Sequence, residues 1–153
     1  LMQSMASFVA QNVGAGQEKR ARKAMVTGMM IGCGVGIFIA VFSFTRGDLL
    51  AYIFSKDEAV IARAAQYLKG FAPEAVVTAI LFSFIGYYNG HSRTLFVMLQ
   101  GLAQTFIVRL PMSYFMSIRP KASLTMIGLA APCATVFGIL LNLLYFIKIT
   151  REK

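Results

Sequence analysis

The chain has 153 residues, a formal net charge of +9, a hydrophobic content of 58% and a mean hydropathy of +0.67, with only 14% charged residues. Soluble globular domains carry about 25% charged residues, so this composition excludes a soluble domain and indicates a membrane protein. The basic residues fall in short clusters between apolar runs, which is typical of loops that orient membrane helices and does not indicate a nucleic-acid-binding surface.

The first apolar segment, residues 1–14, is too short to span a membrane. About thirteen residues at about 1.5 Å each reach about 20 Å, against a hydrocarbon core of roughly 30 Å. The segment also lacks the charged region and the cleavage site of a signal peptide. We therefore expect the end of a truncated helix and a chain that is the C-terminal piece of a longer protein.

A turn and a dense positive cluster follow this segment. Gly14 and Gly16 can adopt the left-handed conformation that ends a helix. Directly after them come Lys19, Arg20, Arg22 and Lys23. Such clusters mark the cytoplasmic edge of a membrane helix, and with this end inside, the C-terminus is also cytoplasmic.

The first complete span is predicted at about residues 24–45, which are uncharged from Met25 to Thr45. Gly28, Gly32 and Gly36 repeat every four residues and therefore share one helical face. Small residues at this spacing let another helix approach closely, so we interpret the three glycines as a packing surface.

Residues 55–69 are too polar to span the membrane and are predicted to form an amphipathic helix at its interface. Ser55-Lys56-Asp57-Glu58 has the form of a capping box, in which the Ser55 hydroxyl and the Glu58 carboxylate satisfy free N–H groups at the helix start. Val60, Ala64, Leu68 and Phe71 then share one side, as expected for a helix that rests on the bilayer or on neighbouring spans.

A second span is predicted at about residues 72–89, where Pro73 and Glu74 suit the first turn of a helix. Thr78, Phe82, Gly86 and Asn89 form one stripe along it.

The third span, at about residues 94–117, follows a short loop and must be antiparallel to the second. Gln100, Gln104 and Pro111 share one side of it. Arg109 lies near the helix end, where its side chain can snorkel to the interface or pair within the bundle.

The last span is predicted at about residues 124–149. Gly128, Pro132, Thr135 and Asn142 line one side. Pro132 leaves a backbone carbonyl without its helical partner and should bend the helix where other groups compensate. The prediction is thus an all-α multispanning helical bundle.

The sequence contains no motif typical of enzymes. It has no Ser/His/Asp set, no phosphate-binding loop, no dinucleotide motif and no cluster with metal-ligand spacing, so neither catalysis nor a metal site is expected. His91 has no acidic partner at ligand spacing and is interpreted as a residue at headgroup level. Cys33 and Cys133 fall inside apolar runs and are expected to be buried free thiols.

Polar residues within the spans are the candidates for function. They suggest a substrate cavity between helices, although hydrogen bonding between helices explains any one of them equally well. The candidate cavity residues are Thr78, Phe82, Asn89, Gln100 and Gln104, and the candidate packing residues are Gly28, Gly32, Gly36 and Pro132.

The order of short motifs along nearly the whole chain resembles the multidrug and toxic compound extrusion (MATE) family. The matching motifs are Ala10-Gln11-Asn12-Val13-Gly14-Ala15-Gly16, Arg20-Ala21-Arg22-Lys23-Ala24, Phe54-Ser55-Lys56-Asp57, Ala72-Pro73, Asn89-Gly90 and Arg109-Leu110-Pro111. The resemblance implies an incomplete six-helix repeat, the C-terminal lobe of a twelve-helix transporter, running from late in helix eight to the end of helix twelve. The N-terminal lobe is then a missing partner of this chain.

The resemblance further implies a function in export. Members of this family export small organic cations by alternating access, driven by entry of Na⁺ or H⁺ and without a cofactor, and the bacterial inner membrane is the implied location. Walls of Phe, Tyr and Met suit varied organic cations.

One departure from the family concerns the coupling carboxylate, which some members carry within the tenth helix. The stretch from Thr78 to Asn89 has no Asp or Glu, and Glu74 lies at the helix mouth. We therefore expect the coupling carboxylate in the missing lobe, and Thr78, Asn89 and the two glutamines in the shared cavity.

Two alternatives stay open. A flippase for lipid-linked oligosaccharides, from the same superfamily, would need Arg109 to hold the anionic phosphate. An accessory membrane subunit would have no transport pathway of its own.

Overall fold

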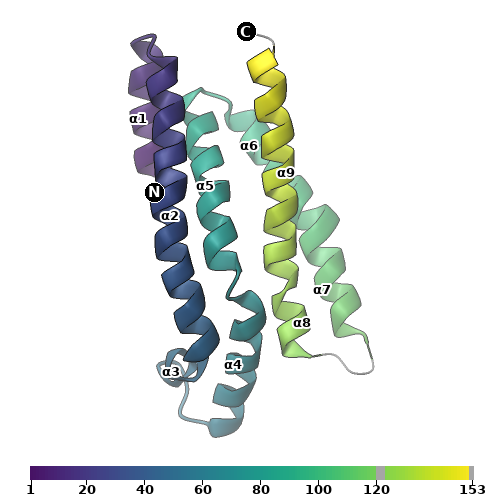
Figure 1. The fold of residues 1–153 in the computed structure, drawn as a ribbon. Coiled ribbons are helices and arrows are strands. Elements are labelled where there is room, and N and C mark those ends of the chain that lie inside the picture. Colours follow the sequence, from purple (N-terminus) through teal and green to yellow (C-terminus); the bar gives the residue numbers. More distant parts are fainter. Residues whose placement is uncertain (120–122, 152–153) are drawn as a thin grey trace.

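The computed structural model describes residues 1–119 and 123–151, which form helices joined by short turns and loops, with no strand among them. The helices lie side by side along one direction (Figure 1), which confirms the predicted all-α multispanning bundle. Their bounds are α1 Met2–Gly14, α2 Glu18–Thr45, α3 Gly47–Tyr52, α4 Glu58–Phe71, α5 Glu74–Gly90, α6 Thr94–Ala103, η1 Gln104–Arg109, α7 Leu110–Ser117, α8 Leu124–Gly128 and α9 Ala130–Arg151. The basic residues Lys121 and Lys153 lie outside the described residues.

Apolar helices long enough to cross a membrane are present in the described part of the chain. Three qualify by length and composition: α2, the run Thr94–Ser117 and the run Leu124–Arg151. Helices α4 and α5 qualify together as one span that is bent by 48°. The run Thr94–Ser117 is continuous but contains the π-helical segment η1. In the run Leu124–Arg151, α8 ends four residues before Pro132, whose missing N–H leaves the Gly128 carbonyl without its helical donor.

The antiparallel order places three chain segments at the same end of the bundle. The α1–α2 turn, the α5–α6 turn and the C-terminal end of α9 lie together, whereas α3 and the start of α4 lie at the opposite end (Figure 1). In the first of these turns Gly16 adopts a φ of +69°, the left-handed conformation expected there. That this end faces the cytoplasm remains a prediction.

Helix α2 packs closely against α5 along its glycine face. A Cβ atom at Gly36 would lie 2.6 Å from the Ala75 carbonyl oxygen, and one at Gly32 would lie 3.0 Å from the Ala79 Cβ. A Cβ atom at Gly28 would contact the Met5 side chain of α1. Gly36 therefore allows a backbone approach that a larger residue would prevent, while Gly28 and Gly32 leave room for side chains of α1 and α5.

The start of α4 differs from the predicted capping box. The N-cap is Asp57, whose Oδ1 accepts a hydrogen bond of 2.8 Å from the Ala59 amide, while the Ser55 hydroxyl accepts one of 3.2 Å from the Asp57 amide. The prediction was wrong because the aspartate, a strong N-cap itself, starts the helix two residues later.

Helix α4 packs against α8. The Thr125 hydroxyl donates to the Gln66 carbonyl oxygen at 2.8 Å. A Cβ atom at Gly128 would lie 2.6 Å from the Tyr67 carbonyl oxygen, so the two helices approach closely. The interfacial position of this segment in a bilayer stays a prediction.

The two cysteines are free thiols, but they are less buried than expected. Cys33 is half-buried and Cys133 is exposed. The expectation of burial was wrong because an apolar run does not specify which of its side chains face the other helices, and Cys133 lies on the outer face of α9.

Candidate functional site

The break between α4 and α5 brings a carboxylate into the bundle. Pro73 has no N–H and therefore cannot continue the hydrogen bonding of α4, and α5 starts at Glu74. The Glu74 side chain is half-buried, and its Oε1 accepts two hydrogen bonds of 2.9 Å, from the hydroxyls of Thr78 and Thr135. A carboxylate at this position also benefits from the positive end of the helix dipole.

The hydrogen bonds continue from Glu74 across three helical segments. Thr135, on α9, is 2% exposed, and its hydroxyl accepts a long hydrogen bond of 3.4 Å from Gln104 Nε2. Gln104 Oε1 in turn accepts one of 2.8 Å from the amide of Gln100, which is 3% exposed. We call Glu74, Thr78, Gln100, Gln104 and Thr135 the polar network.

Two oxygen atoms of the polar network have no hydrogen-bond donor among the described residues. They are Glu74 Oε2 and Gln100 Oε1, and both are buried. A buried acceptor without a donor is costly, so the Glu74 carboxylate oxygen can gain from a proton, and either oxygen can gain from a small cation. Carboxylate, amide and hydroxyl oxygens are the ligands that hard cations prefer. The arrangement is therefore suited to binding and releasing a proton or an alkali cation.

Two local features of the backbone determine where Gln100 and Gln104 lie. Gln104 begins the π-helical segment η1, and such segments are often found at functional sites. Gly138 of α9 faces both glutamines: a Cβ atom there would lie 2.7 Å from Gln100 Nε2 and would also contact Gln104 Oε1. The space left by this glycine is filled by the polar network.

The structure brings together three of the five candidate cavity residues, namely Thr78, Gln100 and Gln104. Phe82 is 41% exposed and borders an apolar groove formed with Gly32 and Gly36. Asn89 is half-buried near the far end of α5, and its side chain forms no hydrogen bond with the described part of the chain. Thr78 borders the same groove, so Phe82 lies next to the polar network, whereas Asn89 lies apart from it.

Sequence reasoning missed Glu74, Thr135 and Gly138 as members or neighbours of this site. Thr135 carried a signal, since it lies on the polar side of the last span. The signal for Glu74 was the Ala72-Pro73 break, because a proline at a helix start can fall inside a bent span as well as at its mouth. Gly138 carried no signal in the sequence.

A second polar cluster joins α2 to α5 at the end of the bundle that holds the α1–α2 turn. His91 Nε2 lies 3.0 Å from Glu18 Oε1, which also accepts a hydrogen bond of 2.8 Å from the Tyr87 hydroxyl. Arg22 Nε lies 3.8 Å from the same carboxylate. His91 has no acidic partner at ligand spacing in the sequence, and the structure supplies one, Glu18, from a distant part of the chain.

Arg109 lies away from the polar network. It is exposed at the end of η1 and forms no ion pair with any described residue. The described residues also contain no group of three or more His, Cys, Asp or Glu side chains that could hold a metal ion.

A family model described as MatE matches residues 1–115 of the 153 residues, from α1 into α7. No curated protein and no solved structure matches the chain.

Proposed function

The chain belongs to the MATE family of membrane transporters, and from this premise we propose that it forms part of a cation-coupled exporter of small organic cations, with Glu74 as a coupling group. In this proposal the chain contributes the C-terminal lobe, an N-terminal lobe completes the pathway, and alternating access moves the substrate. The transporter spans the bacterial inner membrane in several passes, with its C-terminus in the cytoplasm. No cofactor takes part, and the coupling ion is Na⁺ or H⁺.

The observation that carries the proposal is the position of Glu74 beside the break between α4 and α5, two helices that together qualify by length and composition as one bent span. Ionisable side chains inside membrane spans are costly, and those that occur often bind ions or relay protons. Ion sites of secondary transporters are typically formed where a membrane helix is interrupted. The bend of 48° between α4 and α5 provides such an interruption directly beside Glu74. This position favours coupling through this lobe over the earlier expectation of a carboxylate in the other lobe.

The hydrogen bonds around Glu74 indicate how coupling could proceed. With Glu74 ionised, the Thr78 and Thr135 hydroxyls hold Oε1 and leave Oε2 free to take a proton or a cation. Occupation of Oε2 changes the charge between α5 and α9. Because Thr135 joins the two helices through this carboxylate, their relative position is the property that ion binding would alter.

The charge of the polar network favours a cationic substrate over an anionic one. Its only ionisable group is the Glu74 carboxylate, and Arg109 is exposed outside the network. A cavity next to an acidic group attracts cations, whereas a lipid-linked phosphate requires basic residues. These features support the exporter over the flippase.

The test is gradient-driven export by the full-length protein in liposomes loaded with a fluorescent organic cation. A pH gradient and a Na⁺ gradient are imposed separately, and wild type is compared with Glu74→Gln. The glutamine keeps an oxygen for the two threonine hydroxyls but cannot ionise, so we expect the initial export rate to fall about tenfold or more. The matched control is Glu58→Gln, an exposed glutamate in the first turn of α4, which should export at the wild-type rate.

Export by Glu74→Gln at the wild-type rate would contradict the coupling role. Absence of export under both gradients by wild type would contradict the exporter, and translocation of a fluorescent lipid-linked oligosaccharide would then be measured with Arg109→Glu as the variant.

A further inference from the structure

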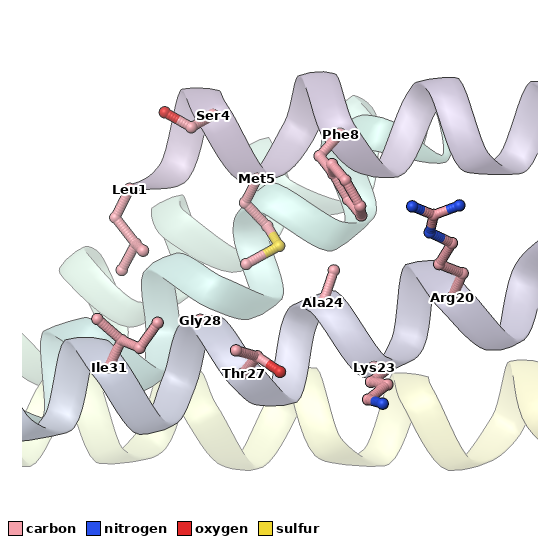
Figure 2. A pocket seen from close by; sticks show the side chains of 10 residues that line it. All are labelled: Leu1, Ser4, Met5, Phe8, Arg20, Lys23, Ala24, Thr27, Gly28 and Ile31. Carbon is pink, nitrogen blue, oxygen red and sulfur yellow. The ribbon is translucent and has the colours of Figure 1, made fainter.

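An open groove runs between α1 and α2 on the outside of the bundle, separate from the polar network. Its volume is about 450 Å³. Most of its walls are apolar side chains from both helices, including Leu1, Met5, Phe8 and Ile31 (Figure 2). An apolar groove that opens sideways from a membrane helix pair faces lipid acyl chains.

Two basic residues stand at one end of this groove. Arg20 and Lys23 both line it, and both are exposed. Figure 2 shows the Arg20 guanidinium pointing from α2 toward α1, beside Phe8, whose ring centroid lies 6.0 Å from the guanidinium carbon. The ten residues that line the groove include no acidic side chain. The basic end therefore offers two positive charges without a counter-charge in the groove itself.

The spacing along α2 matches the depth of one membrane leaflet. From Arg20 to Ile31 the helix rises about 16 Å at about 1.5 Å per residue. The hydrocarbon core of a bilayer is roughly 30 Å thick, so one leaflet accounts for about half of it. The groove thus has a basic end at headgroup level and an apolar path as long as one acyl chain in that leaflet.

We infer that this groove is a binding site for an anionic phospholipid, with the phosphate at Arg20 and Lys23 and an acyl chain along Leu1, Met5, Phe8 and Ile31. The arginine provides a planar donor fork suited to phosphate oxygens, and the lysine adds a point charge. The Thr27 hydroxyl, about one turn beyond Lys23 on α2, also lines the groove and can donate to an ester oxygen of the lipid.

Charge complementarity selects an anionic lipid over a zwitterionic one. A phosphatidylethanolamine headgroup carries an ammonium group that the two basic residues repel, whereas phosphatidylglycerol carries only the negative charge. Anionic lipids are also enriched at the cytoplasmic surface, the side predicted for the α1–α2 turn. The site needs no transport activity, so the inference is independent of the proposed function.

The experiment measures lipid retention by the full-length protein with native mass spectrometry. Phosphatidylglycerol and phosphatidylethanolamine with identical acyl chains are added in equal amounts to the detergent-purified protein. Wild type should retain phosphatidylglycerol preferentially. In the variant R20Q/K23Q, the preference for phosphatidylglycerol should fall roughly twenty-five-fold, since each basic residue near an anionic headgroup contributes about fivefold.

Two further variants separate the groove from general surface charge. The control K148Q/R151Q removes two basic residues of α9 at the same end of the bundle and should keep the wild-type preference. Thr27→Trp keeps both basic residues but fills the exposed groove wall, and it should lower phosphatidylglycerol retention because the acyl chain is displaced.

Three results would overturn the inference. The first is an unchanged preference in R20Q/K23Q. The second is an equal loss in R20Q/K23Q and in the α9 control, which would indicate general attraction to the membrane surface. The third is the absence of phosphatidylglycerol retention by wild type, which would mean that another segment of the full-length protein or a second copy fills the groove.

Discussion

His91 and Glu18 contact each other although 73 positions separate them in the chain: His91 Nε2 lies 3.0 Å from Glu18 Oε1. The other ring nitrogen, Nδ1, lies 2.9 Å from the Tyr87 carbonyl oxygen, which only accepts hydrogen bonds, so Nδ1 carries a hydrogen. The imidazole therefore joins the end of α5 to the start of α2. This pair fixes the two helices at the end of the bundle where the chain turns from α1 into α2.

We expect the Glu18–His91 contact to stabilise the bundle. Glu18→Ala and His91→Ala should each lower thermal stability, and the double variant should lose less than the sum of the two, with a coupling energy of about 1 kcal/mol. The measurement is thermal unfolding of the full-length protein in detergent, followed by circular dichroism. The control pairs His91→Ala with Glu58→Ala, at the other end of the bundle, and these effects should add. Additive effects for Glu18 and His91 would contradict the prediction.

The close approach of α2 to α5 predicts different effects on stability for two glycine-to-alanine substitutions in α2. Gly36→Ala should destabilise the protein by about 1–3 kcal/mol, because the added Cβ would lie 2.6 Å from the Ala75 carbonyl oxygen on the backbone of α5. Gly34→Ala, on the same helix, has open space around its Cβ and should be neutral or stabilising by up to about 1 kcal/mol. Unfolding temperatures of the two purified variants check this. If both variants unfolded at the same temperature, close α2–α5 packing at Gly36 would be refuted.

The substitution Gly138→Ala tests the polar network without replacing any of the five residues that form it. A methyl group there displaces the ends of the Gln100 and Gln104 side chains, which are flexible, so Gly138→Ala should change stability by less than about 1 kcal/mol. The glutamines would nevertheless leave their positions next to Thr135. We therefore expect the export rate of full-length protein in liposomes to fall several-fold.

The control for Gly138→Ala is Gly101→Ala. Gly101 follows Gln100 in α6, and a Cβ atom there meets nothing within 4 Å. This variant should export at the wild-type rate. Equal export by Gly138→Ala and Gly101→Ala would show that the position of the glutamines is not required.

The membrane class and the main helices could be predicted because their signals are local. Hydropathy over about twenty residues identifies a span, and the spacing of Gly28, Gly32 and Gly36 identifies a packing face, since both depend only on the helical repeat. The start of α4 was predicted at the wrong residue because Ser55 and Asp57 both suit an N-cap, and local chemistry alone does not rank two candidate caps that lie two residues apart.

The candidate site was predictable only in part. Thr78, Gln100 and Gln104 were found because polar residues in apolar spans stand out from their neighbours. Glu74 was placed at a helix mouth, because the sequence does not show whether Pro73 ends a span or bends one. Its partner Thr135 lies 61 positions further along the chain.

What the sequence by itself determined is an all-α membrane protein with a glycine packing face, basic clusters at its helix ends and motifs that resemble one transporter family. The tertiary structure alone decided that Glu74 meets Thr135, that Glu18 meets His91 and that Arg20 and Lys23 stand at the end of a groove. The reason is physical: periodicity specifies which residues share a face of one helix, but the face that each helix turns toward another depends on how all the helices pack together.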